Sequence, residues 1–459
     1  MELDKIKNVY FLGIGGIGMS ALARYFNILG KKVSGYDKTP TVLTHDLEQE
    51  GIAITYDDSE ETLDKNADLV VLTPAIPKDS KQLAYYNSSD ILVWKRAKVL
   101  GLIANSGFNI SIAGSHGKTS TSTFTAHLLK TGNKDIAAFL GGISINYQSN
   151  FIEGRTYIVA EADEFDKSFL NLTPDIALIT SVDTDHLDIY GNLDAIKASF
   201  SAFCKQIRPN GICIYNKQVD TKILNPDVKN LSYSLLDTTA DFYTEHLSVN
   251  NGTYIFDIIH PNGKIENVIC NYGGQHNIEN ALGAIAIALQ VGVDIEKIRT
   301  AIASFRGVKR RFETHFKNNR FVYIDDYAHH PREIDAALAA TRELYPNRKI
   351  TAIFQPHLFS RTRDLCDEFA QSLSKVDELI LLDIYPAREL PIEGITSKII
   401  LDKVTIPNKK IIPRESLLNY LDSNIENIDV VITIGAGNID TTVDSITALL
   451  EKNSKEVNE

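Results

Sequence analysis

The chain lacks any long hydrophobic run. No stretch reaches about 18 uninterrupted apolar residues, so a membrane-spanning helix is not expected. Residues 1–5 are polar and lead directly into an apolar strand pattern, without the apolar centre of a secretion signal. The four cysteines, Cys204, Cys213, Cys270 and Cys366, are far apart and form no CxxC motif. We therefore expect a cytoplasmic protein with reduced, buried cysteines and no membrane insertion.

The chain also lacks an excess of positive charge. Lys and Arg number 47 against 59 Asp and Glu, which gives a net charge of −12 at pH 7. This balance argues against nucleic acid or an anionic membrane as the main partner, although it leaves room for a local basic pocket. No internal repeat or low-complexity tract stands out. We expect a monomer or a weak homodimer.

Strand-like and helix-like segments alternate along most of the 459 residues, which predicts an α/β protein with largely parallel sheets. The length suggests about three domains. The turn-forming residues at 105–108 and the basic cluster at 306–311 mark two expected domain boundaries. The predicted domains are therefore residues 1–107, 108–312 and 313–459. In residues 232–271 apolar and polar residues alternate more strictly, and two Asn-Gly pairs are present. Antiparallel hairpins are therefore expected there. The main expected strands are 8–12, 32–36, 69–72, 109–113, 157–160, 176–182, 212–215, 321–324, 350–354, 379–382 and 430–434, and the main expected helices are 17–29, 119–129 and 276–291.

A glycine-turn-lysine loop is the most informative stretch of the chain. It follows a buried-strand pattern and precedes a helix pattern, which is the arrangement of a phosphate cradle. Backbone N–H groups face the anion, a lysine supplies charge, and a threonine hydroxyl can bind Mg²⁺. It is not a full Walker pattern, because Ile112 stands where the first glycine belongs, and an ordinary strand–helix turn is the alternative. The predicted ATP-binding loop residues are Gly114, Ser115, His116, Gly117, Lys118, Thr119 and Ser120.

A second glycine motif, Gly13 to Gly18, follows the first strand, and Asp37 ends the next strand. This spacing is typical of dinucleotide binding and favours an NAD-dependent oxidoreductase when read alone. The same geometry can hold any diphosphate, including that of a UDP-sugar. A hydride-transfer enzyme has no need of a lysine-bearing ATP loop in its next domain, so we disfavour the oxidoreductase.

Polar side chains follow several later strands, where ligands gather in parallel sheets. Glu161 heads an acidic run after strand 157–160 and is a candidate Mg²⁺ ligand, although a solvated acidic loop is the alternative. His186 follows strand 176–182 at the same sheet edge; histidine is an unusual ligand for Mg²⁺, and a loop hydrogen bond is the simpler interpretation. His276 and Asn280 share one face of a predicted helix, where amides can read an adenine edge or act only as caps.

Two loops of the third domain carry histidines and arginines after strands. Residues 325–331 contain Tyr327 and His329, and residues 355–363 contain His357 and Arg361. Arginine can hold a carboxylate with two parallel hydrogen bonds, so a carboxylate pocket is plausible. Taken singly, each of these residues is better explained by a structural role; their clustering favours the pocket.

The ordered series of motifs resembles the Mur ligases of bacterial peptidoglycan synthesis over essentially the whole chain. The matching stretches also include 161–170, Asp185-His186, 276–280, 310–312, 385–387 and 435–437. The resemblance implies a Rossmann-like N-terminal domain, a central P-loop ATPase-type sheet and a Rossmann-like C-terminal domain. It implies ATP-dependent amide formation in the cytoplasm, with UDP-N-acetylmuramate and L-alanine as the other substrates and Mg²⁺ as cofactor.

The resemblance also implies residue roles. Lys118, Glu161, His186, His329 and Arg361 are expected to be catalytic, and Thr119, Glu161 and His186 to organise Mg²⁺. His276, Asn280, Arg311 and Asp326 are expected to bind ATP, and Tyr327, His329, His357 and Arg361 the amino acid. The UDP-sugar residues are expected to be Gly15, Gly16, Ile17, Gly18, Asp37, Thr73, Ala75 and Ile76.

Two departures from the family pattern bear on specificity. Several sister ligases carry a carbamylated lysine about fourteen residues after the histidine that Asp185-His186 matches; here only Lys197 lies nearby, which agrees with an alanine-adding branch. Many alanine-adding ligases have an arginine where this chain has Leu358, so the amino-acid carboxylate is expected to depend more on Arg361. A recycling ligase that adds an intact peptide, an NAD-dependent oxidoreductase and a non-enzymatic ATP switch remain the alternatives.

Overall fold

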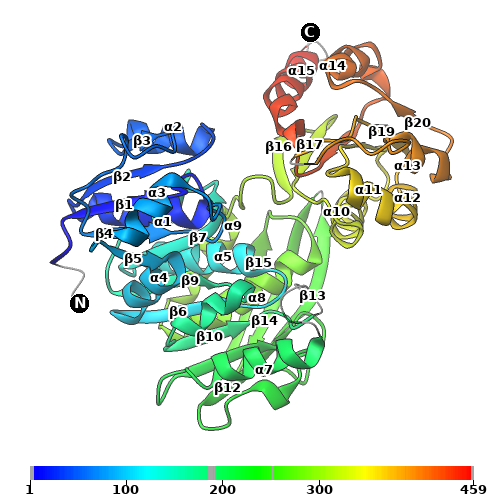
Figure 1. The fold of residues 1–459 in the computed structure, drawn as a ribbon. Coiled ribbons are helices and arrows are strands. Elements are labelled where there is room, and N and C mark those ends of the chain that lie inside the picture. The colour runs from blue at the N-terminus through cyan, green and yellow to red at the C-terminus, as the bar shows by residue number, and fades with distance from the viewer. Residues whose placement is uncertain (1–4, 184–189, 191, 251, 388, 456–459) are drawn as a thin grey trace. The chain divides into compact units, whose positions relative to one another are not determined.

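The structure is a computed structural model, in which residues 5–183, 190, 192–250, 252–387 and 389–455 are described (Figure 1). Three sheets of five, ten and six strands organise the chain. Most strand pairs are parallel, and helices alternate with strands through much of the sequence. The prediction of an α/β protein is therefore confirmed.

The first sheet is entirely parallel, in the order β3-β2-β1-β4-β5. This is the strand order of a dinucleotide-binding fold, in which ligands bind beyond the carboxyl ends of the strands. The glycine motif follows β1, and α4 begins directly after β5 at the same edge. The elements are β1 (Asn8–Leu12), α1 (Ile17–Ile28), β2 (Lys32–Tyr36), α2 (Val42–Gln49), β3 (Ala53–Thr55), β4 (Leu69–Leu72), α3 (Lys81–Ser88), β5 (Leu92–Lys95) and α4 (Arg96–Asn105).

The second sheet has ten strands, in the order β15-β14-β13-β12-β11-β10-β6-β9-β7-β8. At its centre β6 pairs in parallel with β9 and β10, so their carboxyl ends meet at one edge. Its elements are β6 (Phe108–Ala113), α5 (Lys118–Thr131), β7 (Ile136–Ser144), β8 (Ser149–Ile152), β9 (Tyr157–Ala162), η2 (Phe165–Asn171), β10 (Ile176–Ile179), α7 (Leu193–Cys204), β11 (Ile212–Asn216), β12 (Lys229–Ser234), β13 (Phe242–Asn250), β14 (Thr253–His260), β15 (Gly263–Cys270), α8 (Gln275–Gln290) and α9 (Ile295–Ser304).

Two details of the second sheet differ from expectation. The predicted hairpin region begins inside β12, which pairs in parallel with both β11 and β13; only β13, β14 and β15 are joined by two-residue turns that force antiparallel neighbours. Strand β9 extends to Ala162, so Glu161 lies inside the strand, paired with Ile112, rather than after it. The Glu161 side chain is only partly buried, because it lies near the carboxyl end of the strand.

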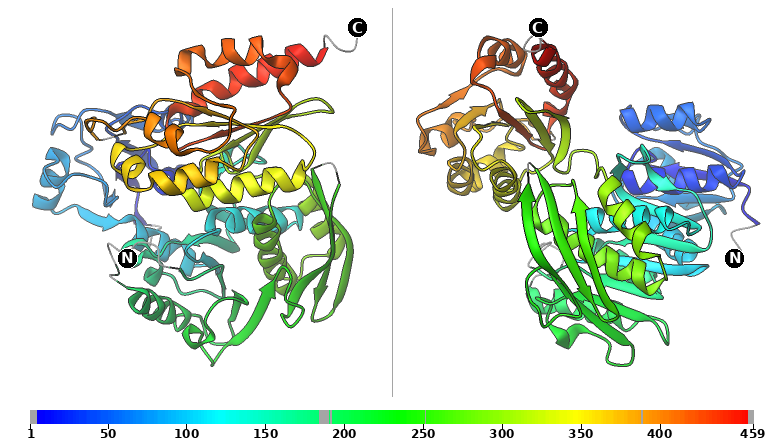
Figure 2. Two further views of the ribbon diagram at one scale, coloured as in Figure 1. Left: turned by 90° about the vertical axis from the view of Figure 1, so that its right-hand side faces the viewer. Right: turned by 180° about the vertical axis from the view of Figure 1, so that it is seen from behind.

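The third sheet has the order β16-β17-β21-β18-β19-β20, and only the β16–β17 pair is antiparallel. Helices α14 and α15 cover one face, and α10 and α12 the other (Figure 2). The elements are β16 (Glu313–Lys317), β17 (Val322–Asp326), α10 (Pro331–Leu344), β18 (Ile350–Phe354), α11 (Phe359–Asp364), α12 (Cys366–Leu373), β19 (Glu378–Leu381), α13 (Lys398–Lys403), β20 (Lys409–Ile411), α14 (Arg414–Ser423), β21 (Val430–Ile434) and α15 (Val443–Lys455).

The chain forms two compact units. Residues 1–246, 256–268 and 279–305 make the first, and residues 247–255, 269–278 and 306–459 make the second. The earlier segments of the second unit are attached by side-chain contacts: Tyr254 Oη and Gln275 Nε2 donate to the Glu343 carboxylate at 3.0 and 2.8 Å. The second unit is therefore discontinuous in sequence, and the domain boundaries at residues 107 and 312 stay predictions.

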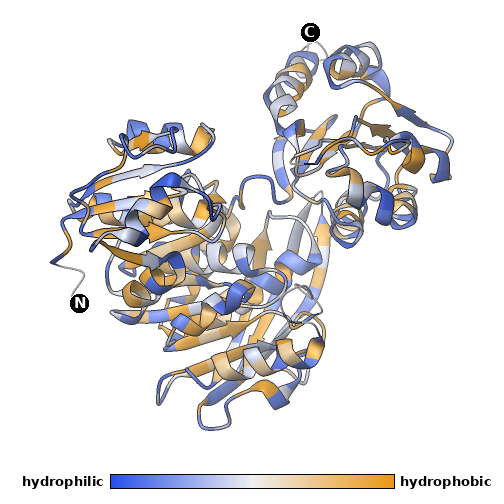
Figure 3. Cartoon of the chain, viewed as in Figure 1, coloured by the Kyte–Doolittle hydropathy of each residue, from blue (hydrophilic) through white to orange (hydrophobic). Residues whose placement is uncertain are grey.

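Hydrophobic residues concentrate on the strands and on the helix sides that pack against them (Figure 3). The central strands β10, β18 and β21 are buried along their whole length, as expected for parallel strands covered on both faces. All four cysteines are buried and unpaired. Within the described residues, no helix is long and apolar enough to cross a membrane.

Candidate functional site

The phosphate loop joins β6 to α5, as the sequence predicts, and its lysine is already engaged. Lys118 Nζ donates to Gly114 O at 2.6 Å and to Glu164 Oε2 at 2.8 Å. Only 12% of the Lys118 side chain and 3% of the Glu164 side chain are exposed. Because water is largely excluded, this ion pair balances a lysine charge that the loop would otherwise bury alone.

Glu161 and Thr119 lie together beside the loop. Thr119 Oγ1 donates to the Glu161 carboxylate at 3.1 and 3.2 Å. The carboxylate lies against Gly141 on the neighbouring strand β7, where a methyl group would be only 2.0 Å from Glu161 Oε2. A hydroxyl and a carboxylate converging at the start of α5 are oxygen donors of the type that Mg²⁺ prefers.

The remaining loop residues are held by the segment that follows β10. Ser115 Oγ accepts from Asp183 N at 2.9 Å, and His116 N donates to Ser181 Oγ at 3.1 Å. Asn280, on α8, lies against Gly117, since a methyl group at Gly117 would be 2.5 Å from Asn280 Oδ1. The loop is thereby fixed on two sides.

The predicted metal ligand His186 lies outside the described residues. Among those that are described, no group of three His, Cys, Asp or Glu side chains forms a metal site. Thr119 and Glu161 fit two ligand positions for a divalent cation, with Gly141 leaving room for the carboxylate. The donor chemistry suits Mg²⁺, which keeps several waters and takes few protein ligands.

The glycine motif of the first sheet is fixed by backbone and carboxylate contacts. Gly15 N donates to Asp37 Oδ2 at 2.8 Å. Gly13, at φ +86°, lies against Thr73 and Ile76, with room for no side chain between them. The structure thus brings the predicted UDP-sugar residues to one edge of the first sheet: Gly15, Gly16, Ile17, Gly18, Asp37, Thr73, Ala75 and Ile76.

Aromatic and cationic side chains meet at the carboxyl ends of β17 and β18 in the second unit. The Tyr327 and His329 rings are 5.4 Å apart, and the His329 and His357 rings 6.1 Å apart. The Arg311 guanidinium carbon lies 5.6 Å from the Tyr327 ring centre. The histidines of the two predicted loops therefore converge, with Arg311 beside Tyr327.

Burial controls the titration of this cluster. Burial lowers the pKa of His329, and the positive charges of Arg361 and Arg311 act in the same direction, against Glu333. Burial likewise lowers the pKa of His357, with Arg361 adding to the effect. Both imidazoles are therefore neutral at pH 7. His329 Nδ1 faces Tyr327 O at 3.1 Å, and a carbonyl only accepts, so the proton is assigned to Nδ1 and Nε2 is left as the acceptor.

Two buried polar atoms in the same cluster have no hydrogen-bond partner in the described part of the chain: Arg361 Nη1 and His357 Nδ1. An unpaired buried donor costs free energy unless a ligand satisfies it. Leu358 lies between these residues and adopts φ +71°, a left-handed conformation that is strained for leucine. The turn that leads into α11 is thus strained next to the two polar atoms that lack a hydrogen-bond partner.

Asp326 has both carboxylate oxygens occupied by backbone groups. Phe312 N and Ala328 N each donate to it at 2.7 Å. Burial raises the pKa of Asp326 to about 6, because desolvation outweighs these hydrogen bonds and the nearby Arg311 charge.

His276, another predicted ATP-binding residue, lies at the start of α8 beside Gly274. It is exposed and belongs to the second unit.

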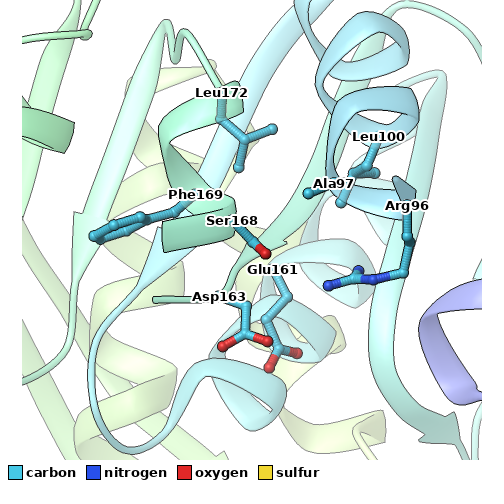
Figure 4. A pocket seen from close by; sticks show the side chains of 8 residues that line it. All are labelled: Arg96, Ala97, Leu100, Glu161, Asp163, Ser168, Phe169 and Leu172. Carbon is cyan, nitrogen blue, oxygen red and sulfur yellow. The ribbon is translucent and has the colours of Figure 1, made fainter. Parts of the chain in front are cut away.

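Sequence reasoning missed three residues at these sites. Glu164 was part of the acidic run but had no assigned role, although it pairs with Lys118. Gly141 had no local signal, because its importance comes from a strand neighbour twenty residues away. Arg96 lies with Glu161 and Asp163 around a small cavity (Figure 4). Its place directly after β5 was the one available signal, since ligands gather at such strand ends.

A lysine-bearing phosphate loop beside a diphosphate-type glycine motif, on parallel sheets, defines a nucleotide-dependent enzyme. Three family profiles match the chain: the Mur ligase family catalytic domain at residues 8–107, the Mur ligase middle domain at 112–288, and the Mur ligase glutamate ligase domain at 310–437. The chain belongs to the Mur ligase family, which confirms the resemblance seen in the sequence.

Curated relatives are similar over nearly their whole length. The UDP-N-acetylmuramate–L-alanine ligase of Flavobacterium johnsoniae is 47% identical over 99% of this chain and 100% of its own. That of Parabacteroides distasonis is 48% identical over 98% and 99%. The solved UDP-N-acetylmuramate–alanine ligase of Thermotoga maritima superposes with a TM-score of 0.81 at 26% identity, covering 98% of this chain and 100% of that one.

Proposed function

We propose that this protein joins L-alanine to the lactyl carboxylate of UDP-N-acetylmuramate at the expense of ATP, in the cytoplasmic synthesis of peptidoglycan precursors. The observation that carries the proposal is the full-length similarity, at 47–48% identity, to ligases named for this reaction. The phosphate loop, the glycine motif and the histidine–arginine cluster supply the three kinds of binding group that the reaction needs.

The reaction begins with transfer of the γ-phosphoryl group of ATP to the lactyl carboxylate, which forms an acyl phosphate. We assign Lys118 to the neutralisation of charge on that phosphoryl group. Its buried pairing with Glu164 holds the ammonium at the loop before nucleotide binds. We assign Gly114, Ser115, His116, Gly117, Thr119 and Ser120 to phosphate contacts, and His276, Asn280, Arg311 and Asp326 to the rest of ATP.

Thr119 and Glu161 are the described residues that would hold Mg²⁺, with His186 as the further proposed ligand. When bound, the ion supplies charge neutralisation at the phosphates. Glu161 accepts a hydrogen bond from Thr119 and has room beside Gly141. The hydroxyl and the carboxylate therefore lie together at the proposed metal site.

The amine of L-alanine then attacks the acyl phosphate, and phosphate leaves. Tyr327, His329, His357 and Arg361 are our assignment for the amino acid. The orphaned Arg361 Nη1 and His357 Nδ1 can take a carboxylate that relieves their lost hydrogen bonds. His329, neutral and with Nε2 free to accept, is our assignment for the base that removes the amine proton.

Phosphate release measured with UDP-N-acetylmuramate, ATP, Mg²⁺ and L-alanine tests the proposal. We expect release only when all three substrates and a divalent metal are present. ATP turnover that ignores the sugar nucleotide would eliminate the ligase. Faster turnover with an alanine-initiated peptide than with L-alanine would replace this function with peptide recycling, and consumption of NADH would revive the oxidoreductase.

A further inference from the structure

The small cavity beside Glu161 contains an arginine that none of the roles above uses. Arg96 begins α4, directly after β5, and is half-buried. Within the described residues, no acceptor forms a hydrogen bond or ion pair with its guanidinium. The cavity is lined by Arg96, Ala97, Leu100, Glu161, Asp163, Ser168, Phe169 and Leu172.

The guanidinium extends toward the two carboxylates of the cavity, with the Ser168 hydroxyl nearby (Figure 4). Arg96 is the cation among these eight lining residues. An anionic group that enters beside Glu161 and Asp163 meets two like charges, and a neighbouring guanidinium can offset that repulsion. The cavity thus has a donor that suits an oxyanion.

The same guanidinium also lies against the glycine motif. A methyl group at Gly18 would be 2.8 Å from Arg96 Nη1 and 3.3 Å from Cζ, so the guanidinium packs directly against this glycine. Arg96 therefore spans the space between the motif assigned to the sugar nucleotide and the carboxylate assigned to the metal. Both belong to the first compact unit.

We propose that Arg96 is a binding residue for the sugar nucleotide and takes one of its oxyanions, either the diphosphate beside Gly18 or the lactyl carboxylate beside Glu161. This inference rests on the proposed function. Arginine suits both groups, because its planar fork offers two parallel donors to a phosphate or a carboxylate. Arg96 thereby holds the acceptor substrate close to the phosphoryl site.

Calorimetric binding of two nucleotides to Arg96→Gln tests the proposal. UDP-N-acetylmuramate carries the lactyl carboxylate, and UDP-N-acetylglucosamine lacks it. We expect the dissociation constant for UDP-N-acetylmuramate to rise at least about tenfold, as for loss of a hydrogen bond to a charged group. An equal rise for both nucleotides assigns the diphosphate, and a rise for UDP-N-acetylmuramate alone assigns the carboxylate.

Lys98→Gln is the matched control. It removes the same charge two residues along α4, from an exposed ammonium that lies 4.2 Å from the Trp94 ring centre. It should leave both affinities unchanged, and ATP affinity should be unchanged in every variant. If Arg96→Gln lowers the melting temperature, Arg96→Lys carries the test, with a smaller loss expected because one ammonium replaces the fork.

Unchanged affinity of Arg96→Gln for both nucleotides would overturn the inference and leave the proposed function intact. Failure of the unaltered protein to bind UDP-N-acetylmuramate would instead overturn the proposed function, and the inference with it.

Discussion

His127 shows how a single buried side chain makes stability depend on pH. Its ring nitrogens lie 2.9 Å from Tyr147 Oη and 3.0 Å from Ser304 Oγ, and burial lowers the pKa of His127 to about 4. The unfolded chain binds a proton near pH 6.5, so it takes up more protons than the folded chain between about pH 6.5 and 4. Stability contributed by neutral His127 is therefore lost as the pH falls through that range.

We predict that His127→Gln flattens the pH dependence of the free energy of unfolding between about pH 4 and 6.5. The difference amounts to about 3 kcal/mol at most, from a shift of about 2.5 pKa units. Urea unfolding at several pH values measures it. His45→Gln, which removes an exposed histidine, controls for the loss of an imidazole as such. An unchanged slope in His127→Gln would show that His127 does not titrate as inferred.

Gly141 provides a second residue-scale prediction. The added methyl group in Gly141→Ala would meet Glu161 Oε2 at 2.0 Å and force the carboxylate away from Thr119. We expect the Mg²⁺ concentration for half-maximal phosphate release to rise about tenfold or more, as when a ligand's support is lost.

Ser144→Ala is the control for Gly141→Ala. It lies on the same strand β7 and removes a buried hydroxyl that has no hydrogen-bond partner in the described part of the chain. Its Mg²⁺ dependence should match the wild type. If Gly141→Ala also matches, Glu161 does not act at the metal.

At the scale of elements, helix α11 carries Arg361 of the predicted amino-acid site. It is short, it starts after the strained Leu358, and it presents Arg361 with one unsatisfied buried N–H group. We predict that Arg361→Ala raises the KM for L-alanine about tenfold or more, while the KM for ATP stays near wild type. Initial rates at varied alanine and varied ATP separate the two constants.

Arg363→Ala is the matched control on the same helix. Arg363 is exposed and pairs with its neighbour Asp364 at 2.7 Å, so its removal should not alter the alanine KM. If Arg361→Ala behaves like Arg363→Ala, the amino acid binds elsewhere.

The elements were largely predictable because their signals are local. The apolar runs at β1, β4, β18 and β21 matched the expected ranges, since buried parallel strands read as continuous apolar segments. The parallel pairing of β12 was not predictable, because its partners are set by packing across the sheet. The site shows the same difference. The phosphate loop is contiguous and was predicted, whereas the contacts of Glu164, Gly141 and Arg96 join segments distant in sequence and were not.

At the scale of the whole molecule, the proposed substrates divide between the two compact units. The UDP-sugar residues, the phosphate loop and Glu161 belong to the first, and Asp326, Tyr327, His329, His357 and Arg361 to the second. On the proposed assignments, each unit supplies residues to the reaction. This is why requiring all three for phosphate release is a stricter test than ATP binding alone.

The discontinuity of the second unit has a consequence for synthesis on the ribosome. Segments 247–255 and 269–278 emerge first, whereas Glu343, which binds Tyr254 and Gln275, comes later, and the last residue of the unit is 181 positions beyond 278. At ordinary elongation rates that delay is roughly 10–35 s. During that interval β13, β14 and β15 can already pair with one another, whereas Tyr254 and Gln275 still lack Glu343, so the first unit must hold these segments before the second unit can form around them.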